Sequence, residues 1–330
     1  MDALSDVLKS IRLDGAVYFD GEFTAPWCGQ ASYGIPHARL REIGADHVIF
    51  FHCVTAGTCR ARLASGGDEV DLGPGDLVLF PHDACHLLGS DLTLAPMVPR
   101  RLAGRDDGPG GLPQLRLGGG GASTRLVCGY LCCNRRVSRG LLSSLPEMFS
   151  VSLRDDEEGD WLINMLRIAV QESAADRAGA QSILTKLSEL LFAESLRRFS
   201  DSQPPNQPGW LGGLRDPIVG RALALIHRQP AQAWSVASLA SACGSSRSVL
   251  AQRFVNLTGQ TPMHYMASHR MALAAQHLRA GRQTIAELAI AVGYGSEAAF
   301  TRAFKREFDT TPSAWREAGL EDRDIPGASD

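Results

Sequence analysis

Residues 285–312, IAELAIAVGYGSEAAFTRAFKREFDTTP, carry the most informative pattern in this chain of 330 residues. Residues 236–262, VASLASACGSSRSVLAQRFVNLTGQTP, are an imperfect copy of the same pattern. Each copy has apolar residues at helical spacing, then a glycine, then a second apolar set at helical spacing. Because glycine adopts positive φ at little steric cost, each copy predicts two short helices joined by a tight turn, which is the helix-turn-helix pattern.

Each copy ends in Thr-Pro, an N-cap followed by proline at the first helical position, so further helices are predicted to begin at Pro262 and Pro312. One such pattern is weak evidence, because ordinary packing of two short helices around a glycine imitates it. Two copies are stronger, since a helix over residues 262–279 would hold two DNA-reading helices at a fixed separation along a duplex. Over about residues 215–318 the sequence resembles the AraC/XylS family of bacterial transcription regulators, which implies sequence-specific binding to double-stranded DNA.

The charge distribution agrees with that resemblance. Residues 215–318 contain 12 Lys+Arg against 6 Asp+Glu, whereas residues 1–214 contain 20 against 26, and the whole chain has a formal net charge of −3. A basic segment beside an acidic one is typical of a module that contacts phosphates. The near-neutral balance of the whole chain therefore does not argue against DNA binding.

The second helix of each pattern carries side chains that can read bases. Arg can bind the guanine edge, Gln the adenine edge and Glu the cytosine amino group, whereas Ala offers only a methyl contact to thymine. Arg253, Lys305 and Arg306 are predicted phosphate contacts, and the alternative for each is a solvated basic face. The positions that match base-reading positions of the family are Arg247, Ser248, Ala251, Gln252, Glu297, Ala298, Thr301 and Arg302.

Residues 17–137 read as short β-rich runs, which predict a small β-barrel or sandwich. The Gly- and Pro-rich residues 96–123 predict a flexible loop. Residues 72–86, LGPGDLVLFPHDACH, resemble the second motif of the cupin barrel in Gly75, Pro81 and His86, with Asp83 where many cupins have glycine. His52 is followed two places later by valine, not by a second histidine, so a three-histidine metal enzyme is not expected. Residues 1–200 resemble the regulatory cupin domain of one AraC subgroup.

A less usual metal site is also open to the sequence. If the strands alternate, His52, His86 and Cys128 face the barrel interior, where imidazoles and a thiolate would suit Zn²⁺. Cys28 or His37 would supply a fourth ligand. The alternative is that the histidines are satisfied core residues and the cysteines are small buried hydrophobic side chains.

The cysteines allow a reading without metal as well. An oxidant could join a pair among Cys128, Cys132 and Cys85 and so reshape the barrel. Without an export signal, the eight cysteines of the chain are not expected to form a disulfide framework. The sequence leaves metal, disulfide and small-molecule sensing open.

The remaining segments complete an α+β prediction with two domains. Residues 1–150 are predicted to form the cupin-like sensor domain, and residues 151–200 a helical segment in which Asp160 caps the first helix. In the resembling family this segment is the dimer contact, although its helices could simply cover the barrel. Residues 201–214 are predicted as a linker, residues 215–318 as the DNA-binding domain, and residues 319–330 as a disordered tail.

The sequence therefore predicts a DNA-binding transcription regulator and not an enzyme. Activation is the commoner output in the resembling family, and an activator would also contact RNA polymerase. An effector, a metal or thiol oxidation in the barrel would modulate a homodimer. The chain has no apolar run that approaches 18 residues and no signal peptide, so a cytoplasmic protein is expected. The alternatives are a cupin-type metalloenzyme fused to a DNA-binding module and a constitutive architectural protein.

Overall fold

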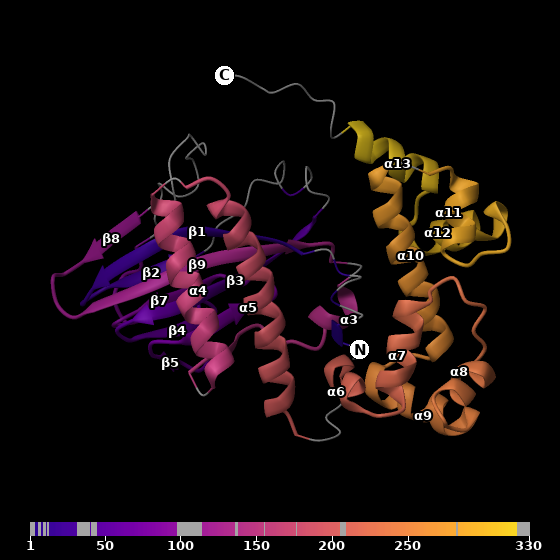
Figure 1. The fold of residues 1–330 in the computed structure, drawn as a ribbon, viewed down its shortest axis with the longest axis horizontal. Coiled ribbons are helices and arrows are strands. Elements are labelled where there is room, and N and C mark those ends of the chain that lie inside the picture. Colours follow the sequence, from indigo (N-terminus) through magenta and orange to yellow (C-terminus); the bar gives the residue numbers. More distant parts are fainter. Residues whose placement is uncertain are drawn as a thin grey trace.

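A β-rich N-terminal domain and a helical C-terminal domain make up the computed structural model (Figure 1). The structure describes residues 4–5, 8, 11, 13–31, 40, 45–97, 114–135, 138–154, 156–175, 177–204, 209–281 and 283–321. The predicted α+β class with two domains is confirmed. Among the described residues, no helix has the length and apolar character needed to cross a membrane.

Two sheets form the N-terminal domain. The larger has the strand order β10-β6-β3-β9-β1-β8 and the smaller β2-β7-β4-β5. Pairing is antiparallel throughout, except that β8 runs parallel to β1. The strands are β1 (Asp14–Thr24), β2 (Cys28–Ala31), β3 (His47–Ala56), β4 (Cys59–Leu63), β5 (Val70–Leu72), β6 (Asp76–Phe80), β7 (His86–Gly89), β8 (Gln114–Gly118), β9 (Ser123–Cys133) and β10 (Phe149–Ser152).

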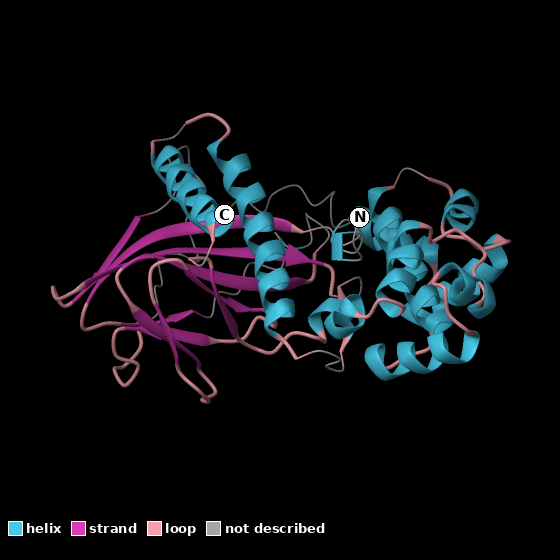
Figure 2. Ribbon diagram, turned by 60° about the horizontal axis from the view of Figure 1, so that its bottom comes forward, coloured by secondary structure: helices cyan, strands magenta, loops and turns pink. Residues whose placement is uncertain are grey.

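Alternation along β3 separates two apolar cores. Val48 and Phe50 point into the barrel and pack with Leu126 of β9, whereas Ile49 and Phe51 point to the other face. On that outer face lie α4 (Glu157–Ala174) and α5 (Ala180–Ser202), which cover the larger sheet (Figure 2). Burial on both faces explains why β3 reads as a continuous apolar run.

Three local expectations need correction. Residues 114–118, inside the predicted flexible loop 96–123, form β8 and pair with residues 20–24. The predicted cap Asp160 lies within α4, and the N-cap is Asp156, whose Oδ1 accepts a hydrogen bond from the Gly159 amide at 2.8 Å. The predicted linker, residues 201–214, contains the end of α5 and α6 (Trp210–Arg215) except its last residue. Residues 155–160 offer three aspartates as possible caps, and residues 201–214 are rich in Pro, Gly and polar residues, which are typical of a loop.

The C-terminal domain contains both predicted helix-turn-helix units. In the first unit α8 (Val236–Ala242) and α9 (Arg247–Thr258) meet at Gly244, and in the second α11 (Ile285–Ala291) and α12 (Glu297–Phe308) meet at Gly293. Both glycines have positive φ, +68° and +84°, as the sequence required. We call these units the first motif and the second motif.

Single helices flank and join the two motifs. The helix α7 (Val219–Arg228) precedes the first motif, and α10 (Pro262–Ala280) runs between the two. The Thr261 side chain caps α10 and proline stands in its first turn, as predicted. The last helix, α13 (Pro312–Glu321), packs against α10 (Figure 1).

The first motif shares its core with the sensor domain. One apolar cluster continues from the outer face of the larger sheet through α3 (Arg139–Leu142) and α6 into α7, α8 and α9. At this junction the Trp210 amide donates to Ser144 Oγ at 2.8 Å, and its indole Nε1 donates to the Tyr265 hydroxyl at 2.9 Å. The second motif has a separate apolar cluster with Phe300 and Phe304 at its centre.

Candidate nucleic-acid interface and barrel site

The second helix of each motif presents one polar face. Ser246 and Ser296 cap α9 and α12, and Leu250, Phe254, Phe300 and Phe304 bury the opposite side of these helices completely. The predicted base-reading positions follow the spacing i, i+1, i+4, i+5, so each set shares one helix face. Arg247, Ser248, Gln252, Glu297, Ala298 and Arg302 are exposed, and Ala251 and Thr301 are half-buried.

The three predicted phosphate contacts differ in their surroundings. Lys305 and Arg306 are exposed on α12. Arg253 instead places its guanidinium 2.5 Å from a carboxylate oxygen of Asp216. The Asp216 side chain is 3% exposed, and its other oxygen accepts hydrogen bonds from the Ile218 and Val219 amides at 2.9 Å each. Arg253 thus ties α9 to the segment before α7, and this ion pair favours a structural role for the residue over the phosphate contact predicted from the sequence.

Three of the predicted metal or redox residues meet inside the barrel. His52 and Cys128 are directly opposite one another on β3 and β9, and His52 Nδ1 lies 2.7 Å from Cys128 Sγ. On the other side of the same ring, His52 Nε2 lies 2.7 Å from His86 Nε2. All three side chains are buried, and the Phe80 ring stacks on His86 with centroids 3.5 Å apart.

Their hydrogen bonds fix the protons along this row. Burial lowers the pKa of His86 to about 4. Burial, and to a lesser extent repulsion from His86, lowers the pKa of His52 well below its usual value. Both rings are therefore neutral. His86 Nδ1 donates to the Ala84 carbonyl at 2.7 Å, so His86 Nε2 accepts from His52 Nε2. His52 Nδ1 therefore accepts the Cys128 thiol proton. Burial raises the pKa of Cys128, which keeps that proton in place.

This arrangement does not fit a single zinc ion held by His52, His86 and Cys128. Two nitrogens on a tetrahedral zinc lie about 3.3 Å apart, which is farther than the hydrogen-bonded histidine pair. The Cys128 thiol also lies on the opposite side of the His52 ring from His86. Within the described part of the chain, no group of three His, Cys, Asp or Glu side chains is arranged to hold a metal ion.

The fourth ligand considered for that site lies elsewhere. Cys28 pairs with Gly89 in the β2–β7 ladder, three positions from the pair formed by Ala31 and His86. An odd number of positions reverses the face of a strand, so Cys28 points away from the interior and packs with Leu87. His37 lies outside the described residues.

The predicted redox cysteines are also separated. Cys128 and Cys132 both face inward but stand four positions apart on β9, about 13 Å, whereas a disulfide needs Cα atoms within about 7 Å. Cys85 is only half-buried and accepts a hydrogen bond from Gln30 Nε2 at 3.1 Å. Its pairing with Cys128 stays a prediction.

An apolar cavity opens beside His52 and Cys128. The cavity volume is about 30 Å³, which is enough for one or two waters. Aromatic and aliphatic residues of both sheets form most of its wall, and the described lining residues with polar groups are His52, Cys128, Gln30 and Trp27, whose buried indole Nε1 has no hydrogen-bond partner. The apolar wall consists of Phe19, Phe23, Trp27, Ala31, Leu88, Met97, Leu115, Leu117 and Leu126.

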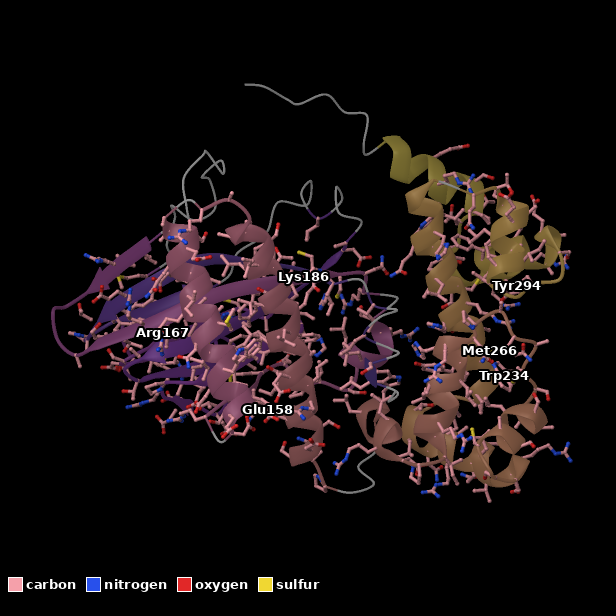
Figure 3. All side chains as sticks on the ribbon, viewed as in Figure 1. Glu158, Arg167, Lys186, Trp234, Met266 and Tyr294 are labelled. Carbon is pink, nitrogen blue, oxygen red and sulfur yellow. The ribbon has the colours of Figure 1, made fainter. Side chains whose placement is uncertain are left out.

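An exposed apolar stripe crosses the two helices that cover the sheet. Trp161 and Ile168 lie seven residues apart on α4, and Ile183 and Leu190 lie seven apart on α5, so each pair shares a helix face. These four side chains are 42–55% exposed. Glu158, labelled in Figure 3, lies at the end of the stripe and lines a cavity of about 350 Å³ together with Trp161 and Leu190.

Sequence reasoning missed three side chains that organise the DNA-binding domain. Asp216 forms an ion pair with Arg253. The Tyr265 hydroxyl accepts a hydrogen bond from the Trp210 indole and also bonds His227. Arg270 donates hydrogen bonds to three main-chain carbonyls. Asp216 follows a helix and precedes proline, which is a typical capping position. The sequence carries no comparable local signal for the other two.

Comparisons with known proteins agree with this architecture. A family model described as Cupin matches residues 2–201, and one described as Helix-turn-helix domain matches residues 239–318. An AraC-like transcription regulator of Streptomyces lividans is 33% identical over 276 residues, 82% of this chain and 88% of that protein. The HTH-type transcriptional regulator AlkR of Acinetobacter baylyi is 28% identical over 319 residues, 96% of this chain and 99% of that protein. The RCS-specific HTH-type transcriptional activator RclR of Escherichia coli K12 is 28% identical over 318 residues, 96% and 98% of the two chains.

Proposed function

The chain belongs to the AraC/XylS family of DNA-binding transcription regulators, and on that premise we propose that it is an activator whose output is set by an effector bound in the barrel. The observation that carries the proposal is the apolar cavity beside the His52–Cys128 pair. Because the wall is mainly apolar, and His52 and Cys128 are neutral and already hydrogen-bonded within the protein, the cavity fits an uncharged, mainly apolar molecule. The activating sign is supported by RclR, whose name is that of an activator.

Binding in this cavity would move its wall. The space holds only one or two waters, so a larger molecule must push side chains of β1 and β8 outward. The helix α5 packs closely on β1, since a Cβ at Gly15 would lie 2.7 Å from Ser188 Cβ. The end of α5 is bound in turn by α6, where Arg215 donates to the Ser200 carbonyl at 2.8 Å. We propose this row of contacts as the route from effector to first motif.

Thermal unfolding of the full chain with 1-hexanol and with hexanoate tests the proposed ligand chemistry. Hexanol should raise the melting temperature and hexanoate should not, because the cavity offers no charge partner to a carboxylate. Ala31→Phe, which fills the cavity, should abolish the shift, whereas Leu94→Phe at an exposed position should preserve it. Equal shifts with both compounds, or a hexanol shift that survives Ala31→Phe, would contradict the proposed site.

Thiol oxidation is the second candidate, favoured by the acceptance of the Cys128 proton by His52. Burial argues against thiol oxidation, because it raises the pKa of Cys128 and so suppresses the reactive thiolate. Intact mass after mild peroxide treatment separates the two, since a deficit of about two daltons restored by reduction would indicate a disulfide. A zinc-bound form and the fused metalloenzyme rank lower, because the ring orientation of His52 does not converge with its neighbours on one ion.

We further propose that two copies associate through the stripe on α4 and α5. Apolar side chains that recur every seven residues on two neighbouring helices suit a two-fold helical interface. Arg167 donates to the Thr55 carbonyl and Lys186 pairs with Glu189 within the same copy, so the apolar side chains of the stripe, with Glu158 at one end, carry the proposed contact (Figure 3). Ile168→Lys should convert a dimer into a monomer in light scattering, and Leu94→Lys should not. A wild-type monomer at micromolar concentration would contradict this proposal.

A further inference from the structure

The two motifs have separate apolar cores, so their relative orientation depends on a small number of contacts. The core of the first motif ends in α10 at Met266, and that of the second begins in the same helix at Met271. A continuous helix fixes the distance between two units along its axis. Contacts beside the helix must then fix how the second unit is rotated against the first.

Arg270, on α10 between the two cores, makes those contacts. Its Nε donates to the Pro230 carbonyl at 2.6 Å and one Nη to the Gln232 carbonyl at 2.8 Å, both in the loop that leads into the first motif. The other Nη donates to the Gly293 carbonyl, in the turn of the second motif, at 3.1 Å. Arg270 is 8% exposed, and its guanidinium carbon lies 5.9 Å from the ring centre of Tyr294, which is labelled in Figure 3.

The loop and the turn also touch directly at Gly293. A Cβ at this position would lie 2.8 Å from the Ala231 carbonyl oxygen and 2.8 Å from the Arg270 guanidinium, which is closer than real Cβ atoms approach. Gly244 occupies the equivalent turn of the first motif, and a Cβ there would meet open space. Close approach at Gly293 is therefore a feature of the junction between motifs and not of the helix-turn-helix turn itself.

From these contacts we propose that Arg270 is a positioning residue that locks the rotation of the second recognition helix, α12, against the first, α9. The planar guanidinium has donors in a fixed fork, so three carbonyl partners hold the loop, α10 and the turn in one arrangement. A protein locked in this way reads two half-sites at a single separation on one face of the duplex. This inference deepens the DNA-binding function and is independent of the effector.

The full-length wild-type chain is first used to select a binding sequence from random duplexes of about 30 base pairs. A duplex of this length accommodates two half-sites one helical turn apart. Two derivatives of the selected duplex are then made. One has about five base pairs inserted between the half-sites, which rotates one of them by roughly half a turn, and the other keeps only the first half-site. A chain that selects no sequence at all would contradict the DNA-binding function itself, not the role of Arg270.

The wild type should prefer the selected spacing over the insertion by about a hundredfold, because only that spacing lets both motifs bind together. Arg270→Met should reduce this preference to below about tenfold and leave affinity for the single half-site within about twofold. Arg270→Lys, which keeps the charge without the fork, should give an intermediate preference. A folded Arg270→Met chain with the wild-type preference would overturn the proposal.

The glycine pair keeps the test decisive if Arg270→Met does not fold. Gly293→Ala and Gly244→Ala impose similar backbone strain, since both residues have positive φ, but only Gly293→Ala collides with the Arg270 junction. Gly293→Ala should lose the spacing preference and Gly244→Ala should retain it, with circular dichroism confirming helicity in both. Equal preferences in the two alanine variants would overturn the proposal.

Discussion

Replacing Arg253 by methionine tests whether this residue stabilises the fold or contacts a DNA phosphate. Removing one partner of a fully buried ion pair costs about 3–5 kcal/mol. Here Asp216 keeps two amide donors, and the Arg253 side chain is 42% exposed, so we expect a loss of about 2 kcal/mol in unfolding free energy. For a domain the size of residues 215–318, that loss of unfolding free energy lowers the melting temperature by about 10 °C.

The same variant should leave the salt dependence of DNA binding almost unchanged. Each phosphate contact that is lost reduces the slope of log affinity against log salt by about 0.9. Lys305→Met, at an exposed position of α12, should show that reduction with little change in stability. Fluorescence anisotropy on the selected duplex, at salt concentrations from about 50 to 200 mM, measures both slopes. The reasoning is refuted if Arg253→Met leaves stability intact and lowers the slope as Lys305→Met does.

Three further predictions concern buried groups. Phe304→Ala should cost about 4 kcal/mol by calorimetry, because Phe304 is fully buried in the second core. Tyr265→Phe should cost about 1–2 kcal/mol, since its hydroxyl bonds both Trp210 and His227, and an unchanged melting curve would contradict the role of that junction. The folded pKa of His86, about 4, lies below its ordinary 6.5, so the unfolded chain takes up the proton first as the pH falls. Its stabilisation is complete above pH 6.5, and about 3 kcal/mol is lost by pH 4, which urea unfolding against His86→Gln should detect.

The helix-turn-helix units could be predicted from the sequence because their signals are local. Apolar periodicity, the glycine turns and the Thr-Pro helix starts each depend on neighbouring residues, and the structure places all of them as expected. The alternation of β3 and β9 likewise predicted which side chains face the barrel interior. Alternation alone therefore predicted that His52 and Cys128 share the barrel interior, without the register between the two strands.

The errors arise where tertiary structure decides. The short strand β2 has no sequence pattern of its own, so the outward direction of Cys28 followed only from its pairing with β7. The sequence also gives no ring orientation for His52, and that orientation turns a possible ligand set into a row of hydrogen bonds. Arg270 on α10 resembles any solvated helical arginine until the fold brings two loops to it.

The boundary between the two apolar cores within α10 has a consequence for biosynthesis. Every residue of the core that joins the barrel to the first motif precedes residue 267, and every residue of the other core follows residue 270. A chain emerging from the ribosome can therefore complete the first core while the second motif is still being translated. The N-terminal half of α10 then provides a folded template onto which the remaining turns of the helix, and with them the last helices, can be added.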